Sequence, residues 1–226
     1  AFLAELSADR HVSVQDSRPC VAFLNGEYWG LYNLRERFKP EYLRNHYGVN
    51  ESNVWIIEAG RPDTGGDAAE DFWEQTLEFI SGNDMSVEEN YIAACDLVDM
   101  QSLIDFYCIN LYADNTDVAF NRNFAAWRTI LPDDTAYGDG RWRFMLYDMD
   151  GSLNQYDNNT FAETEEGIGL MDEALIRSLM NHEGFRKQFC LTFLDIANTV
   201  FAYEKVHHSL MEWKDIYRTQ VTESHR

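Results

Sequence analysis

Residues 23–37, FLNGEYWGLYNLRER, carry the clearest structural signal in this sequence. The pair Asn25–Gly26 is typical of a type I′ β-hairpin, because both central positions of that turn require a positive φ. An apolar run over residues 20–24 precedes the pair, and residues 27–35 follow it with several aromatic side chains. We therefore expect two antiparallel strands joined by a two-residue turn.

Downstream of this hairpin, the spacing of apolar residues predicts a short helix and a further strand. Pro40 suits the first turn of a helix over 40–47, and Gly48 suits the position just past its end. A buried strand is expected over 53–58, and the Gly- and Asp-containing segment 60–67 is expected to be a loop.

Helical spacing then continues for about fifty residues. One helix is expected over 69–81, and a capping box at 86–89 is expected to open a second. Asp99 is a suitable N-cap for a third helix that runs to Ala113. These segments separate the first hairpin from a polar, turn-rich region.

The rest of the chain predicts a second hairpin and a helical C-terminal part. Residues 124–130 and 141–147 have strand character, residues 150–169 are polar and loop-like, and residues 170–226 have helical spacing. This order of strands, helices, hairpin and helices indicates an α+β fold, not the βαβ alternation of a doubly wound sheet. The length of 226 residues fits a single domain, with residues 20–152 carrying its motifs.

Charge and hydropathy exclude several classes of function. The net charge of −21 and the lack of a basic stripe argue against a nucleic-acid partner. No apolar run reaches the roughly 20 residues that a membrane-spanning helix needs, so no membrane insertion is expected. The four cysteines form no CxxC pair, which argues against a zinc ribbon, and free thiols are expected, with one disulfide as the alternative. They are Cys20, Cys95, Cys108 and Cys190.

Two polar clusters could carry chemistry. The first spans residues 114–123, DNTDVAFNRN, and the second is Asp148-Met149-Asp150, at the end of the next expected strand. Mg²⁺ prefers one or two carboxylates completed by water and substrate phosphates. Kinases place an Asp and an Asn on one loop and a metal-binding Asp after the next hairpin. The spacing by itself is compatible with such a site and equally with ordinary loop capping.

The residues of the first hairpin resemble the signature of the CotH kinase family, the family of the spore coat protein H. Its pattern is an apolar strand, then N-G-x-Y-x-G-x-Y, then a leucine and a glutamate, as in residues 23–37. Residues 115–123 and 141–150 are similar to later motifs of the family, in the same order. The resemblance implies an atypical protein-kinase-like fold that uses ATP and a divalent metal, such as Mg²⁺, to phosphorylate Ser residues of partner proteins.

By this resemblance, Asp117 corresponds to the catalytic Asp and Asp148 to the metal-binding Asp, with Asp150 as a second acid. Asn121 or Asn123 corresponds to the metal-binding Asn. Family members often have two adjacent asparagines here, whereas Arg122 separates them in this chain, so both stay candidates.

Glu36 and its neighbour Arg35 are candidates for the nucleotide site. Glu36 could orient a nucleotide-contacting base, as a kinase glutamate does, or it could form an ion pair at the end of the strand. The nucleotide-contacting base of the family lies upstream of the hairpin, where only Arg10 and Arg18 are candidates. We therefore expect the N-terminal portion of the kinase domain to be missing from this sequence.

The resemblance favours a protein kinase whose partner is a coat or surface protein, located in a spore coat or otherwise outside the cytoplasm. The rival interpretation is a non-catalytic coat or cell-surface assembly module. In that case the acidic loops would bind Ca²⁺ or stay solvated. Nucleotide-dependent binding would distinguish the two interpretations.

Overall fold

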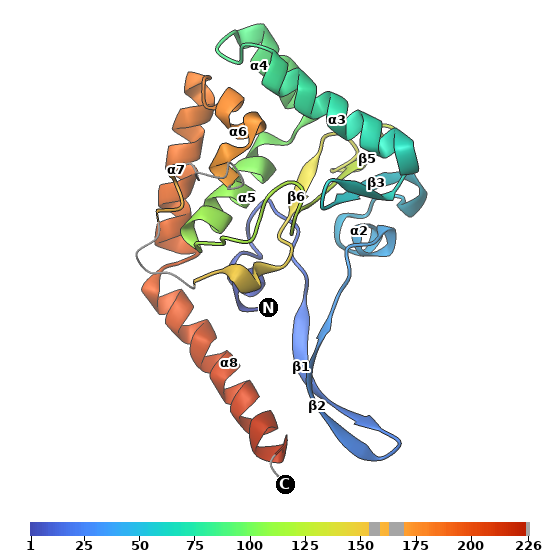
Figure 1. The fold of residues 1–226 in the computed structure, drawn as a ribbon, viewed down its shortest axis with the longest axis vertical. Helices are drawn as coiled ribbons and strands as arrows, with labels where there is room; N and C mark the ends of the chain where they lie inside the picture. Colours follow the sequence, from blue (N-terminus) through green and yellow to red (C-terminus); the bar gives the residue numbers. More distant parts are fainter. Residues whose placement is uncertain (154–158, 163–169, 225–226) are drawn as a thin grey trace.

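A computed structural model describes residues 1–153, 159–162 and 170–224 of the chain. Much of the loop expected over 150–169 lies outside these residues. The helices expected beyond residue 170 are present, and Figure 1 shows how helices surround a central sheet. The α-helices are α1 (Phe2–Leu6), α2 (Pro40–Tyr47), α3 (Gly66–Gly82), α4 (Glu88–Leu97), α5 (Met100–Tyr112), α6 (Ala174–Leu179), α7 (Glu183–Thr199) and α8 (Tyr203–Ser224).

The strands form two separate antiparallel sheets, which with the helices make the α+β fold expected from the sequence. A two-stranded sheet pairs β1 with β2, and a four-stranded sheet has the order β4-β3-β5-β6. The strands are β1 (Ser17–Leu24), β2 (Glu27–Arg35), β3 (Val54–Glu58), β4 (Arg61–Thr64), β5 (Ala125–Thr129) and β6 (Arg143–Met145).

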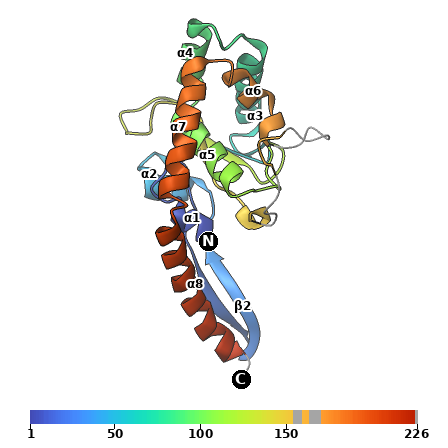
Figure 2. The same cartoon turned by 90° about the vertical axis from the view of Figure 1, so that its left-hand side faces the viewer.

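The hairpin of β1 and β2 confirms the expectation from the Asn-Gly pair. Asn25 and Gly26 have φ values of 52° and 85°, as a type I′ turn requires. The hairpin extends well away from the four-stranded sheet (Figure 1), and α8 runs alongside β2 (Figure 2). The hydroxyl of Tyr217 on α8 donates to Asn33 Oδ1 at 2.9 Å. The C-terminal helix therefore supports the base of this extension.

The segment expected to be a loop over 60–67 contains a strand instead. β3 turns directly into β4 through Ala59 and Gly60, which have φ values of 50° and 76°. Thr64 adds side-chain bonds to this pairing, because its Oγ1 accepts from the N–H of Ile56 at 2.9 Å. An Ala in the first central position is an unusual residue for this turn, so the sequence did not reveal the hairpin.

The start of α4 also differs from the expectation. The N-cap is Val87, and no side-chain bond caps the helix. Ser86 bonds to the preceding turn, since its N–H and its hydroxyl both donate to Asp84 Oδ1. The predicted capping box at 86–89 is therefore wrong, because Asp84 competes for the serine. At α5, by contrast, Asp99 accepts from the N–H of Ser102 at 3.1 Å, as expected of an N-cap.

Helix α5 lies at the centre of the fold, between the sheet and α7 (Figure 1). Eleven of its 13 residues are buried, and the eight apolar ones belong to the larger of two apolar clusters. The smaller cluster packs α2 against the sheet through Leu43, Trp127 and Met145. All four cysteines are free. Within the described residues, no helix is long and apolar enough to cross a membrane.

A buried carboxylate on α5 anchors the N-terminal segment. Asp105 is fully buried, and its oxygens accept from Arg10 Nε and Nη2 at 3.3 and 2.7 Å and from the N–H of His11 at 2.8 Å. Arg10 also pairs with the exposed Asp195 of α7 at 2.5 Å. Arg10 is therefore occupied in holding elements together and is not available as the nucleotide-contacting base considered from the sequence.

We expect Asp105→Ala to lower the free energy of unfolding by about 3–5 kcal/mol, because it leaves a half-buried guanidinium without its main partner. The melting temperature should fall by roughly 10 °C in a thermal melt followed by circular dichroism. The matched control is Asp195→Ala, which removes the exposed partner of the same arginine and should cost less than about 1 kcal/mol. Equal losses in both variants would contradict the assignment.

Candidate functional site

The Asp-containing loop begins directly after α5, and one asparagine shapes it. Asn115 is buried, and its Nδ2 donates to Asn110 Oδ1 on α5 at 2.9 Å. Its Oδ1 accepts from the N–H of Asp117 at 3.3 Å. The loop is therefore folded back onto the end of the helix, and this fixes the position of the Asp117 backbone.

The carboxylate of Asp117 is half-exposed and has two neighbours in the same loop. Arg122 Nε lies 2.9 Å from Asp117 Oδ1, and Asn123 Nδ2 donates to Asp117 Oδ2 at 2.8 Å. Asn123 has a φ of 51°, a conformation that Asn adopts more readily than most residues. Asn121 is exposed, and its backbone lies beside Gly60. Of the two asparagines, it is thus Asn123 that the structure brings to Asp117.

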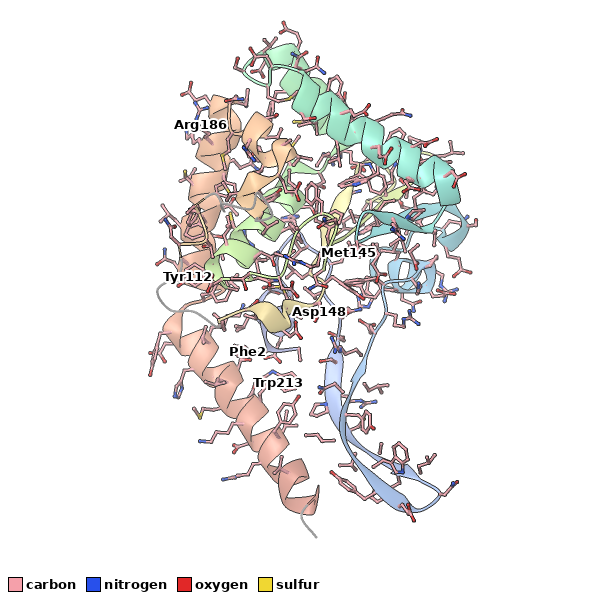
Figure 3. The ribbon with its side chains drawn as sticks, in the orientation of Figure 1. Phe2, Tyr112, Met145, Asp148, Arg186 and Trp213 are labelled. Carbon is pink, nitrogen blue, oxygen red and sulfur yellow. The ribbon has the colours of Figure 1, made fainter. Side chains whose placement is uncertain are left out.

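The second cluster follows β6. Figure 3 shows Asp148 just past the end of this strand, below Met145 and beside the base of the hairpin. Asp148 has a left-handed backbone with φ 46° and ψ 76°, and Met149–Gly151 then form one 3₁₀ turn. This sharp reversal turns the chain from the sheet toward the Asp117 loop.

The two loops meet at a glycine that sequence reasoning missed. A Cβ on Gly151 would lie 2.9 Å from the Cβ of Asp117 and 3.1 Å from Asn115 Oδ1, which leaves no room for a side chain. Asn115 Nδ2 also lies 3.4 Å from the sulfur of Met149. The available signal was the glycine that directly follows the two acids.

The electrostatics of Asp148 also reflect this proximity. Burial raises its pKa, and the neighbouring carboxylate of Asp150 raises it further. Asp117 acts in the same direction, whereas Arg35 lowers the pKa. Acids that repel one another in this way lose that repulsion when a cation binds between them.

The donor set suits a hard divalent cation. Asp148 and Asp150 supply two adjacent carboxylates, and Mg²⁺ needs no more than one or two when water and phosphate complete its coordination. Across the described residues, no three His, Cys, Asp or Glu side chains are grouped closely enough to hold an ion by themselves. The residues therefore fit a metal that is shared with a phosphate ligand, and not an all-protein cage.

A cavity of about 430 Å³ opens beside Asp148, at the base of the hairpin. We call it the arginine cavity, because Arg35 and Arg37 line it and, among the described residues, neither has an ion-pair partner within 4.0 Å. Lys39 lines it as well but is paired with Asp63. Three carboxylates, those of Glu36, Glu58 and Asp148, line the same cavity, so the two arginines supply its unpaired positive charge.

Glu36 lines the arginine cavity but is held by other groups. Its Oε1 lies 2.9 Å from Nε2 of His46, and its Oε2 accepts from the N–H of Asp16 at 3.0 Å. The expected alternative of an ion pair with an adjacent arginine is not what forms. The carboxylate instead fixes the segment between the two arginines, because it links this segment to α2 and to the chain before β1.

The hairpin, the two loops and the antiparallel sheet together define a kinase-like α+β protein. The family model described as CotH kinase protein matches residues 1–225. The chain therefore belongs to the CotH kinase family, in agreement with the resemblance of its hairpin. None of the curated proteins compared with the chain matches it.

We expect Gly151→Ala to separate the two loops and to lower the free energy of unfolding by about 1–3 kcal/mol, as overpacking does. Thermal or urea unfolding measures this loss. Gly82→Ala is the matched control, because nothing lies within 4 Å of its Cβ position and its φ is not positive. That variant should be neutral or slightly stabilising. An unaffected Gly151→Ala variant would show that the loops do not touch.

We expect Asp148→Asn to raise the melting temperature in metal-free buffer at pH 8. The folded-state pKa of Asp148 is raised, so its charge costs stability above that pKa, and the cost disappears below the unfolded-state value. The gain should therefore shrink as the pH falls toward 4.

Asp84→Asn is the control with the opposite sign. Hydrogen bonds from Ser86 lower the pKa of Asp84, so this variant should lose stability at pH 8 and recover it in acid. Melting curves of both variants and the wild type over this pH range provide the comparison. A pH-independent gain for Asp148→Asn would contradict the electrostatic explanation.

Proposed function

We propose that this protein catalyses metal-dependent phosphoryl transfer from ATP to Ser hydroxyls of a partner protein. The observation that carries the proposal is the position of Arg35, which lines the arginine cavity together with Asp148. A polyphosphate needs positive charge on one side and a metal-binding acid on the other. Membership of the CotH kinase family supports the same conclusion.

Different residues would contact the phosphates and the adenosine part of ATP. Arg35 and Arg37 would bind phosphate oxygens, and Glu36 would keep both arginines in place through its bonds to His46 and Asp16. The adenosine part would extend along the remainder of the arginine cavity. ATP would therefore enter beside the hairpin base, with its terminal phosphate toward Asp148.

Asp148 and Asp150 would hold a divalent cation such as Mg²⁺, with the amide of Asn123 as a further ligand. When bound, this cation neutralises charge on the phosphate oxygens. Asn121 is the weaker candidate, since it is Asn123 that contacts the carboxylate of Asp117. The chain's own contribution is to hold these donors within reach of one another.

Asp117 would act as the base. Its carboxylate accepts the proton of the serine hydroxyl while the serine oxygen forms a bond to the γ-phosphorus. The bond from that phosphorus to the bridging oxygen breaks, and its electron pair leaves with ADP. Arg122 and Asn123, which contact the two oxygens of Asp117, would orient the carboxylate toward the acceptor.

The partner would be a coat or surface protein, and the protein would act in a spore coat or elsewhere outside the cytoplasm. Both statements extend what the family name implies. The rival proposal, a coat or surface assembly module without catalysis, predicts a different ligand response. Thermal melting would then shift with Ca²⁺ alone and not with Mg²⁺ plus ATP.

The proposal predicts transfer of label from γ-³²P-ATP to a serine-containing protein. We expect Asp117→Asn and Asp148→Ala to reduce incorporation by at least about a hundredfold, in line with the loss of a general base or a metal-binding acid. Equal incorporation in the wild type and both variants would exclude these assignments.

The asparagine pair supplies a matched comparison in the same assay. Asn123→Ala should lower the rate and raise the Mg²⁺ concentration needed for half-maximal activity. Asn121→Ala should behave like the wild type, because Asn121 is exposed and no hydrogen bond joins it to Asp117 among the described residues. The reverse result would assign the metal to Asn121.

A further inference from the structure

A second cavity, of about 390 Å³, adjoins the first at the acids. It is bounded by α1, the base of the hairpin, α8 and the segment 149–153, and Figure 3 shows Phe2 in this region between α8 and the hairpin. We call it the Leu153 cavity. Arg35 and Asp148, together with Asn33, line both cavities, so these residues form the wall between them.

This arrangement matters because phosphoryl transfer needs two substrates on opposite sides of the transferred group. The attacking and leaving oxygens lie roughly in line with the phosphorus. If ATP occupies one side of the wall formed by Arg35 and Asp148, the acceptor must approach from the other. The Leu153 cavity meets the arginine cavity at Asp148 and has a separate lining beyond it, which makes it the candidate for this approach.

The lining of the Leu153 cavity does not suit a polyphosphate. Arg35 is the one Lys or Arg among its lining residues, whereas three basic side chains line the arginine cavity. Apolar side chains make up much of the rest: Phe2, Leu3, Met149, Leu153 and Tyr217 contribute. A ligand with little charge and an apolar side chain fits this chemistry better than a nucleotide does.

Two hydroxyl groups at this cavity have unused hydrogen-bonding capacity. The Oγ atoms of Ser17 and Ser152 are buried, and neither has a hydrogen-bond partner within the part of the chain that the structure describes. Both residues line the Leu153 cavity, one from β1 and one from the segment after the acids. Buried polar groups are rarely left unpaired, and an extended peptide offers both a donor and an acceptor at each residue.

Leu153 has a strained backbone conformation and an exposed apolar side chain. Its φ is 59°, which is uncommon for a residue other than Gly, Asn or Asp, and the residue is 59% exposed. The N–H of Leu153 donates to the carbonyl of Ala113 at 2.7 Å, which keeps the backbone in place. Strain combined with an exposed apolar side chain is typical of a ligand contact.

We propose that the Leu153 cavity is the acceptor site and binds an extended protein segment in which an apolar residue neighbours the serine. The peptide main chain bonds to Ser17 and Ser152, and its apolar side chain packs on Leu153. The serine hydroxyl lies at the Asp150 end of the cavity, where Gly151 meets the loop of the proposed base Asp117. The assignment rests on the proposed function, since it names the substrate that this function requires.

The test compares peptides that differ in one neighbour of the serine, using the full-length protein. One peptide places Leu beside a single Ser, and the other places Gly there. The wild type should have a KM for the Leu peptide roughly tenfold lower than for the Gly peptide. Leu153→Asn should remove this preference by raising the KM for the Leu peptide, while the affinity for Mg²⁺-ATP stays unchanged. Asn tolerates a positive φ, so the variant should fold.

Leu131→Asn is the matched control. Leu131 is also an exposed leucine, and it lines none of the described cavities near the acids. It should keep the wild-type preference. An unchanged KM for the Leu peptide in Leu153→Asn would overturn the proposal, as would an equal effect of Leu131→Asn.

A binding experiment without ATP separates this proposal from the proposed function. A fluorescent Leu peptide with Ala in place of Ser cannot be phosphorylated, so its anisotropy measures binding to the Leu153 cavity without any transfer step. Binding by the wild type that Leu153→Asn weakens supports the acceptor site even if no transfer is detected, in which case the catalytic proposal fails by itself. Equal binding by both proteins, or none by the wild type, overturns the acceptor site.

Discussion

The fold depends on the burial of α5, and this burial requires partners for the carboxylate of Asp105. Asp105 has no exposed surface, and an unpaired charge in such a position would cost several kcal/mol. Arg10 and the backbone of His11 satisfy it from the N-terminal segment, 95 and 94 residues away in the chain. The helix can therefore lie between the sheet and α7, and its C-terminal end becomes a fixed point from which the Asp117 loop starts.

At that end of α5, hydrogen bonds and a missing side chain define the candidate site. Asn115 joins the helix to the Asp117 loop, and Gly151 lets the segment after β6 come close to the same loop. Neither residue carries charge or reacts. They decide how far the acids lie from one another, and the metal chemistry proposed for the site depends on that distance.

The proximity of Asp148 to Asp150 and Asp117 costs free energy, through repulsion between carboxylates and through a strained backbone. Asp148 has a raised pKa and a left-handed backbone, and a protein that needed only stability would have no reason to keep either. Arg35 offsets part of the repulsion and divides the site into two cavities of different chemistry. The proposed placement of a phosphate-rich ligand on one side and of a peptide on the other rests on this difference in lining.

The sequence by itself determined the elements whose causes are local. The β1–β2 hairpin follows from Asn25 and Gly26, because both residues accept a positive φ, and the helix caps at Gly48 and Asp99 have similarly local causes. The order of the motifs along the chain also indicated the acids of the two loops, and it indicated the family. The β3–β4 hairpin escaped notice because Ala59 stands where a turn residue is expected.

Only the tertiary structure decided which of these residues meet. It brought Asn123, and not Asn121, to Asp117, and it occupied Arg10 in a buried ion pair. It linked Glu36 to His46, not to a neighbouring arginine, and it showed why Gly151 has no side chain. The physical reason is that each outcome depends on burial and contacts between separate elements, which the local pattern of a sequence does not encode.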